Sequence, residues 1–279
     1  MAGKISLKVA TSIKRISEYV QKFGMAKGLS KAAEHLIMSR GLLSRKLFRT
    51  TSPEGSNVWL RPNSSDLATY REVFVNGEYD LRKFAIFEAV RLRYESLLAS
   101  GSRPLIIDAG ANIGLASVFL ARLFPKAEFI LVEASFESIE VAKLNVAEIP
   151  NTRLLNRALW HQHTALSLVT SSNYSTYSVT DRSDPEAALS RIDSITMSEI
   201  VGARGADLFI VKMDIEGSES SVFRINNEWL DEEPVILVEP HDQEIPGNHS
   251  LRGLLEHEKY QLADVIMNGT TMIFVPQRL

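Results

Sequence analysis

The chain has 279 residues, of which 45% are hydrophobic, and a formal net charge of −3 at pH 7. It contains no cysteine, which excludes disulfides, cysteine nucleophiles and thiolate metal sites and fits a reducing compartment. No apolar run approaches the roughly 18 residues that a membrane span requires, and the N-terminus lacks the apolar core of a secretory signal. These features predict a cytoplasmic protein with one large core, or with a core and an appendage.

Charge is unevenly distributed along the chain. Residues 1–49 contain 11 Lys and Arg residues against Glu18 and Glu34, so this segment carries +9 and the remainder −12. Apolar residues recur at helical spacing from Ile13 to Phe23, which predicts a basic helical arm over residues 1–49. Our first interpretation is a helical cap or dimer contact with solvated lysines, and the alternative is docking to a membrane surface or an anionic polymer. The acidic main body argues against a nucleic-acid substrate.

The following elements predict an α/β fold. Turn-forming residues at 50–69 indicate a linker, and the domain after it is expected to span residues 70–279. Residues 70–80 alternate like a strand and contain the turn signal Asn76-Gly77, and 84–99 predict a helix. Apolar runs then alternate with helical segments, which is typical of a mostly parallel sheet covered on both faces. The predicted strands are 105–108, 128–133, 153–159, 208–214 and 235–239, followed by an antiparallel pair at the sheet edge within 260–276.

The stretch IIDAGANIG (106–114) lies between a predicted strand and a predicted helix. Glycine permits close approach of the backbone to a ligand, and Gly110 and Gly114 are expected to serve this purpose. The helix that begins near Asn112 would direct its free N–H groups into the same crevice. Glu133 ends the next strand, 19 residues after Gly114, where a carboxylate can accept hydrogen bonds from ribose hydroxyls. Together these residues predict a nucleoside-binding cleft.

The same loop indicates which nucleoside binds. Dinucleotide-binding proteins use GxGxxG, and this loop lacks the middle glycine that admits a pyrophosphate. The negative charge of Asp108, directly before the loop, would repel a phosphate but suit a cationic amino-acid moiety. We therefore expect S-adenosylmethionine rather than NAD.

Four segments resemble the FkbM family of S-adenosylmethionine-dependent methyltransferases: IIDAGANIGLASVFLARLFPKAEFILVEASFES, NRALW, VKMDIEGSES and PVILVEPH. The resemblance covers roughly residues 70–240 and implies the class I methyltransferase fold, a seven-stranded sheet with one antiparallel strand. It also implies O-methylation of sugars, glycolipids or polyketides. The cofactor-binding residues expected from the loop and these segments are Asp108, Gly110, Asn112, Gly114, Glu133, Ala134, Ala158 and Asp214.

The chain departs from the family at one point. Where the family commonly has Thr-Leu-Asp, this chain has Thr196-Met197-Ser198. If the family's aspartate caps a helix, Ser198 can replace it. If that aspartate contributes to catalysis, the activity is in doubt.

Ligands of open α/β sheets bind beyond the carboxyl ends of the strands, which places Asp214 on the cleft floor. Lys212, Asp214, Glu216 and Glu219 form a dense charged set, in which residues 212 and 214 share one strand face and can pair. Structural ion pairing near a helix N-terminus is the alternative role for Glu216 and Glu219. We also count Glu216 among the substrate-binding candidates.

Three residues are candidates for the general base. His241, after the fifth predicted strand, could take the proton of the substrate hydroxyl, and Glu239 or Asp214 could do so instead.

His161 and His163 occupy alternate positions, as a pair of metal ligands can. The spacing offers no third ligand, so we favour packed or exposed histidines over metal ligands. We therefore assign no metal site.

The polar segment 170–188 separates the third and fourth predicted strands. Its hydroxyls and aromatic rings suit a carbohydrate, so we expect Asn173, Tyr174, Ser175 and Tyr177 to recognise the acceptor. A segment without function is the alternative.

Three functional hypotheses follow. The first is an O-methyltransferase acting on a sugar, glycan or related small molecule. The second is a metal-assisted hydrolase that uses the carboxylates and His241 to hold Mg²⁺. The third is a cofactor-binding scaffold that has lost its activity.

Overall fold

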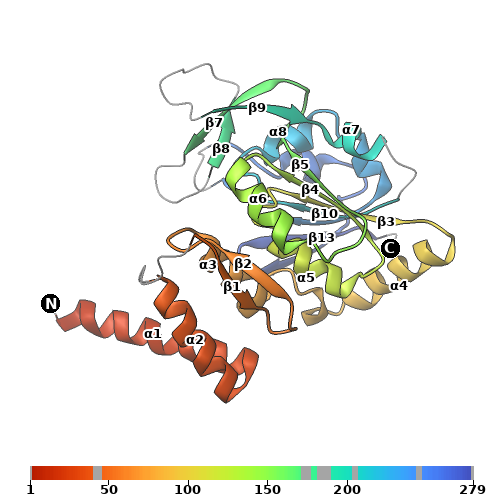
Figure 1. Cartoon of the computed structure of the whole chain (residues 1–279). Coiled ribbons are helices and arrows are strands. Elements are labelled where there is room, and N and C mark those ends of the chain that lie inside the picture. Colours follow the sequence, from red (N-terminus) through yellow and green to blue (C-terminus); the bar gives the residue numbers. More distant parts are fainter. Residues whose placement is uncertain are drawn as a thin grey trace. The chain divides into compact units, whose positions relative to one another are not determined.

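The structure is a computed structural model that describes residues 2–39, 46–170, 177–180, 190–202, 207–242 and 247–277 (Figure 1). The chain divides into two compact units, Met1–Gly77 and Glu78–Leu279. The boundary lies after Gly77 rather than at residue 70. The segment 50–69 was expected to be a linker, but it contains a strand pair and the start of a helix.

The first unit begins with two helices, α1 (Ala2–Phe23) and α2 (Met25–Ser39). Gly24 joins them with a φ of 78°, a left-handed conformation that glycine adopts without a steric penalty. The helices pack closely at Gly28, where an added Cβ would lie 2.5 Å from the Val20 Cα. Their buried interface also holds Tyr19 and His35, whose Oη and Nδ1 atoms are 2.6 Å apart.

The secondary structure after α2 in the first unit differs most from the elements predicted from the sequence. Strands β1 (Phe48–Thr51) and β2 (Asn57–Leu60) form an antiparallel pair, followed by α3 (Asp66–Tyr70) and a π-helix, η1 (Arg71–Asn76). The strand predicted over 70–80 was therefore wrong. Residues 73–75 are all buried, whereas a half-buried strand would alternate. Gly77, with a φ of 64°, ends the π-helix and does not turn a hairpin.

The second unit contains a seven-stranded sheet with the order β12-β13-β11-β10-β3-β4-β5. Only β13 runs antiparallel to its neighbours, and it lies next to the edge strand β12. This confirms the predicted seven-stranded, mostly parallel sheet and the antiparallel strand pair at its edge, with the antiparallel strand second from the edge. The strands are β3 (Pro104–Ala109), β4 (Glu128–Glu133), β5 (Thr152–Asn156), β10 (Asp207–Met213), β11 (Val235–Val238), β12 (Asp264–Asn268) and β13 (Thr271–Val275).

Helices cover both faces of this sheet. In Figure 1, α4, α5 and α6 lie on one face and α7 and α8 on the other. The second face carries a core cluster in which Ala109, Met213 and Val238 pack with Ile200 of α7 and Phe223 of α8. The helices of this unit are η2 (Leu81–Lys83), α4 (Phe87–Ala99), α5 (Leu115–Leu123), α6 (Phe136–Asn145), α7 (Met197–Gly202), α8 (Glu219–Arg224), η3 (Glu228–Glu232) and α9 (Arg252–Glu256). In the described residues, no helix combines the length and apolar character that crossing a membrane requires.

A smaller sheet is inserted after β5. Its order is β6-β9-β7-β8, made from β6 (Ala158–Leu159), β7 (Ala165–Thr170), β8 (Tyr177–Thr180) and β9 (Ser190–Ile195). The single strand predicted over 153–159 is thus two strands. The break falls at Arg157, whose N–H donates to the carbonyl of Leu155 instead of a neighbouring strand.

Candidate active site

The loops that build the site follow the carboxyl ends of neighbouring parallel strands. Ala109, the last residue of β3, pairs with Val132 of β4 on one side and Met213 of β10 on the other. Met213 in turn pairs with Val238, the last residue of β11. Because these strands are parallel, the segments after them gather beyond their carboxyl ends, where open α/β sheets bind ligands.

The glycines of the first loop have structural tasks. Gly110 has a φ of 70°, and a Cβ there would lie 1.7 Å from the Asp214 carbonyl oxygen. The backbone after β10 therefore approaches Gly110 so closely that only glycine fits there. Gly114, with a φ of 78°, precedes α5, and a Cβ added there would lie 3.1 Å from Val146 Cγ1 and 3.3 Å from Leu131 Cδ2.

Asp108 does not have the environment that its predicted role requires. Its carboxylate is fully buried, where Oδ2 accepts a hydrogen bond from the Ser117 hydroxyl at 2.7 Å and Oδ1 lies 3.3 Å from the Lys212 ammonium. Burial would lower the pKa of Lys212, but the charge of Asp108, together with Tyr79 and Asp214, raises it. Asp108 therefore neutralises a buried lysine, so it is not placed to meet a cationic ligand.

Glu133 combines a structural task with access to the cleft. Its carboxylate accepts hydrogen bonds from the backbone N–H groups of Asn112 and Ser135, both at 2.7 Å. Burial raises its pKa, although these two hydrogen bonds act in the opposite direction. Each carboxylate oxygen can accept more than one hydrogen bond, so Glu133 can still receive a ligand hydroxyl.

An open cleft brings the predicted cofactor residues together. It encloses about 650 Å³, part of which is bulk solvent. Six of the eight predicted cofactor-binding residues line it, and Asp108 and Gly114 are not among its lining residues. The predicted residues in the lining are Gly110, Asn112, Glu133, Ala134, Ala158 and Asp214, together with Glu216.

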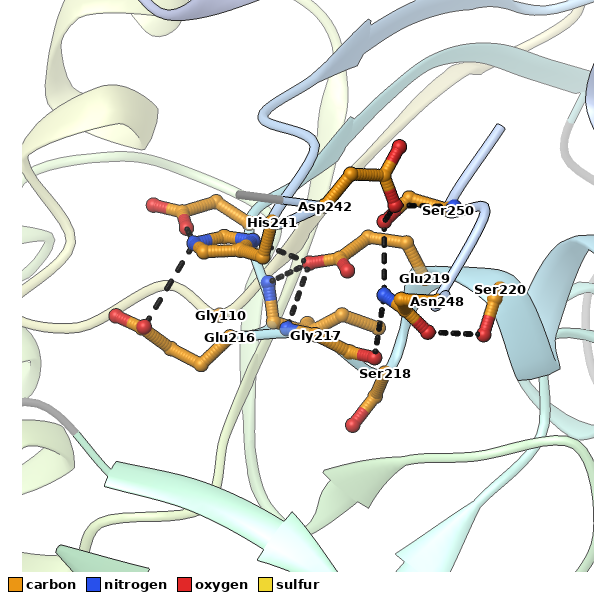
Figure 2. A network of polar contacts seen from close by, with 12 residues as sticks. Gly110, Glu216, Gly217, Ser218, Glu219, Ser220, His241, Asp242, Asn248 and Ser250 are labelled. Carbon is orange, nitrogen blue, oxygen red and sulfur yellow. Dashed lines mark hydrogen bonds and ion pairs between the residues drawn. The ribbon is translucent and has the colours of Figure 1, made fainter. Parts of the chain in front are cut away.

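Asp214 and Glu216, which line this cleft, belong to a cluster of charged side chains that also contains Glu219 and His241. Figure 2 shows the polar contacts of this cluster. The His241 Nδ1 atom is 2.9 Å from Oε1 of Glu219, and its Nε2 atom lies 3.7 Å from Asp214 Oδ1 and 3.6 Å from Glu216 Oε2. Glu219 is fully buried, and the same Oε1 accepts the N–H groups of Ile215 and Gly217. Glu219 therefore fixes both the loop after β10 and the orientation of the imidazole.

The sequence did not predict that partnership, because Glu219 and His241 are 22 residues apart. Its only signal was the density of acidic residues between 214 and 219. The structure thus assigns Glu219 a task within the site and not only at the start of α8.

Mutual proximity shifts the pKa values of the cluster. Burial, followed by the charge of Asp214, raises the pKa of Glu216 to about 7. The same two causes, in the same order, raise that of Glu239 to about 7. Burial would lower the pKa of His241, but the hydrogen bond with Glu219 and the charges of Glu219, Asp214 and Glu216 raise it to about 9. The cluster holds more negative charge than its own cations balance.

The predicted acceptor residues can be placed only in part. Asn173, Tyr174 and Ser175 lie outside the described residues, and Tyr177 opens β8. Val179, two residues further along β8, lines the cleft. The polar segment therefore adjoins a strand that reaches the cleft wall.

The structure also places Ser198, His161 and His163, for which the sequence left alternative roles open. Thr196 and Glu199 form a capping box on α7, in which the Glu199 N–H donates to the Thr196 hydroxyl and the Glu199 carboxylate accepts the Thr196 N–H. Ser198 is exposed in the first turn of this helix. His163 is exposed beside Glu199, and His161 lies against the Trp160 ring.

No family model matches this chain, so membership of the FkbM family stays a prediction. A curated relative, methyltransferase sdnD of Sordaria araneosa, is 31% identical over 78 residues, which are 28% of this chain. The chain spans about a quarter of the length of that relative, 24%.

Several solved structures are similar at low sequence identity. A putative O-methyltransferase from Klebsiella pneumoniae is 10% identical with a TM-score of 0.38, covering 68% of this chain and 80% of its own. A putative caffeoyl-CoA O-methyltransferase from Staphylococcus aureus is 11% identical with a TM-score of 0.35, covering 75% and 97%. Precorrin-6y C5,15-methyltransferase from Geobacter metallireducens is 12% identical with a TM-score of 0.37, covering 67% and 85%.

Proposed function

We propose that the protein is an S-adenosylmethionine-dependent methyltransferase of the FkbM type that methylates a hydroxyl of a sugar, glycan or related natural product. One observation carries the proposal: residues after β3, β4 and β10 that were expected to bind this cofactor line a single cleft. The name of the curated relative agrees with the reaction type.

The side chains of the cleft suit this cofactor. Glu133 ends β4, where it can accept hydrogen bonds from ribose hydroxyls. Val132, Ala158 and Leu159 offer apolar surface to a base. Asp214 supplies negative charge near a sulfonium or ammonium group.

The reaction that we propose is a direct displacement. When bound, the cofactor supplies a methyl group activated by the positive sulfur. The acceptor oxygen attacks the methyl carbon, the carbon–sulfur bond breaks with its electron pair going to sulfur, and a cleft side chain takes the hydroxyl proton. Asp214, Glu239 and His241 are the proposed catalytic residues.

Most of the acceleration is expected from positioning. Holding the acceptor oxygen in line with the methyl group removes much of the entropic barrier, and proton removal adds to it. Carboxylates near the sulfonium favour binding, but they stabilise the transition state little because the positive charge disappears as the methyl group leaves.

We further propose that Asn173, Tyr174, Ser175, Tyr177 and Glu216 contact the acceptor. This assignment is supported by the adjacent Val179 and by Glu216, which both line the cleft.

We propose that the protein is cytoplasmic and that its basic arm contacts either a membrane surface or a second copy of the chain.

Calorimetric titration with S-adenosylhomocysteine in chelator tests the cofactor. We expect binding, and we expect Glu133→Ala to weaken it at least about tenfold because a hydrogen-bonded carboxylate is worth about 1.5–3 kcal/mol. Glu140→Ala is the matched control, since Glu140 is exposed on α6. Absence of binding would refute the proposal.

Transfer of a labelled methyl group to a panel of saccharides tests the reaction. Cofactor binding without transfer, with no effect of His241→Ala, would favour the inactive scaffold. Hydrolysis that requires a metal but no cofactor would favour the hydrolase.

A further inference from the structure

Asp214 and Glu216 of the cleft lining and the adjacent His241 offer three donor atoms at a spacing that suits one metal ion. One donor atom from each of Asp214, Glu216 and His241 lies within 4.8 Å of the others. The His241 Nε2 atom is 3.7 Å from Asp214 Oδ1 and 3.6 Å from Glu216 Oε2, beyond hydrogen-bonding distance. Ligands that each lie about 2.1 Å from a common ion are separated by roughly 3.0–4.2 Å. Both separations fall within that range.

The imidazole is held so that its Nε2 atom faces the two carboxylates. His241 is 8% exposed, and its hydrogen bond is made by Nδ1 with the fully buried Glu219. Figure 2 shows the ring between Glu216 and Glu219. A histidine ligand of a metal typically uses its other nitrogen to donate to a carboxylate, as this arrangement allows. With Nδ1 as the donor, Nε2 faces two carboxylate oxygens, so positive charge is favoured between them, carried either by a proton on Nε2 or by a metal ion that replaces this proton.

The charge balance also favours a cation. Asp214, Glu216, Glu219 and Glu239 contribute four carboxyl groups, against which a protonated His241 supplies one positive charge. Lys212 is nearest to Asp108 and lies 3.7 Å from Oδ2 of Asp214. The sulfonium cofactor brings one positive sulfur and an ammonium group balanced by its own carboxylate. A divalent ion would compensate two of the remaining negative charges.

We propose that Asp214, Glu216 and His241 bind a divalent transition-metal ion in the cleft. Two carboxylate oxygens and one imidazole nitrogen form a donor set that suits Mn²⁺, Fe²⁺ or Zn²⁺ better than Mg²⁺, which prefers oxygen ligands. Three protein ligands leave coordination positions for an acceptor oxygen. This role rests on the proposed function, and it leaves Glu239 as the side chain that takes the hydroxyl proton.

Mn²⁺ titration of the chelator-treated full chain tests the site, by calorimetry and by the loss of the free-ion electron paramagnetic resonance signal. We expect one ion per chain and at least about a tenfold loss of affinity in His241→Ala. His163→Ala is the matched control, because His163 is an exposed histidine that also lies beside a carboxylate. Glu219→Gln should weaken Mn²⁺ binding by about 10–100-fold through the orientation of His241. The affinity of each variant for S-adenosylhomocysteine in chelator reports whether the cleft has kept its fold.

The outcomes separate this inference from the proposed function. Failure to bind Mn²⁺, or unchanged binding in His241→Ala, would overturn the metal site even if the cofactor product binds and methyl transfer proceeds in chelator. Mutual exclusion of Mn²⁺ and S-adenosylhomocysteine would also overturn it, because the cluster would then be the site of the cofactor's ammonium group. Mn²⁺ binding to a chain that does not bind the cofactor product would support the ion site and refute the methyltransferase.

Discussion

Replacing Gly110 by alanine tests the closest contact of the site. An added Cβ would lie 1.7 Å from the Asp214 carbonyl oxygen, so the two loops must separate by at least about 1.3 Å to restore the 3.0 Å that real Cβ contacts require. Alanine at a φ of 70° costs about 1–2 kcal/mol, and overpacking adds about 1–3 kcal/mol. We therefore expect Gly110→Ala to lower the free energy of unfolding by about 2–5 kcal/mol and to weaken S-adenosylhomocysteine binding, because Asp214 must move.

Gly101→Ala separates the steric effect from the conformational one. Gly101 has a similar φ, 83°, but its Cβ would meet no atom within 4 Å. Urea unfolding should therefore show that Gly110→Ala is less stable than Gly101→Ala by about 1–3 kcal/mol. Equal stability of the two variants, with unchanged affinity for the cofactor product, would refute the argument that this loop fits tightly against the backbone of Asp214.

Three further predictions concern charge and pH. Lys212→Met leaves the fully buried Asp108 without its cation and should lower the free energy of unfolding in urea by about 3–5 kcal/mol. Lys143→Met, at an exposed ion pair, should lower it by less than about 1 kcal/mol. Similar losses in the two variants would contradict the argument. Ser198→Asp restores the aspartate of the family triplet at an exposed helix position, so methyl transfer should not change, and a marked rise would connect this position with catalysis. Burial, followed by the charges of Lys31 and Arg71, lowers the pKa of His35 to about 3. The contribution of neutral His35 to the free energy of unfolding is therefore complete above its ordinary pKa of 6.5 and is lost as the pH falls from 6.5 towards 3. In urea unfolding followed by circular dichroism, the stability of the chain relative to that of the His35→Gln variant should therefore fall by about 2 kcal/mol between pH 7 and pH 5.

The sequence predicted the sheet well because buried parallel strands are continuous apolar runs. The run at 128–133 matches β4 residue for residue, and the run at 235–239 exceeds β11 by one residue. The π-helix was not predictable in this way. Its apolar residues, Val73, Phe74 and Val75, are adjacent and fit neither a strand nor an α-helical period. Tertiary burial of all three decides the conformation there.

The direction of side chains at the strand ends was harder to predict than their positions. Asp108 was assigned to the cofactor because it precedes the glycine loop, and it faces the opposite side of the sheet from Ala109. In a fully buried strand both faces are apolar, so Ile106 and Ile107 give no signal of which face a following aspartate joins. Glu133 was predictable because the last residue of β4 reaches the cleft.

The pairing of Asp108 with Lys212 has a consequence for the cleft. Both residues lie inside the strands, at paired positions of β3 and β10, so the pleat fixes their side chains and their charges compensate each other within the core. The negative charge left for a ligand must therefore come from residues after the strand ends, where the backbone is free to turn. Glu216, with a φ of 53°, does this at the cleft floor. If Asp108 faced the cleft instead, Lys212 would be a buried cation without a fully buried partner, and its positive charge would weaken any cation site built on Asp214.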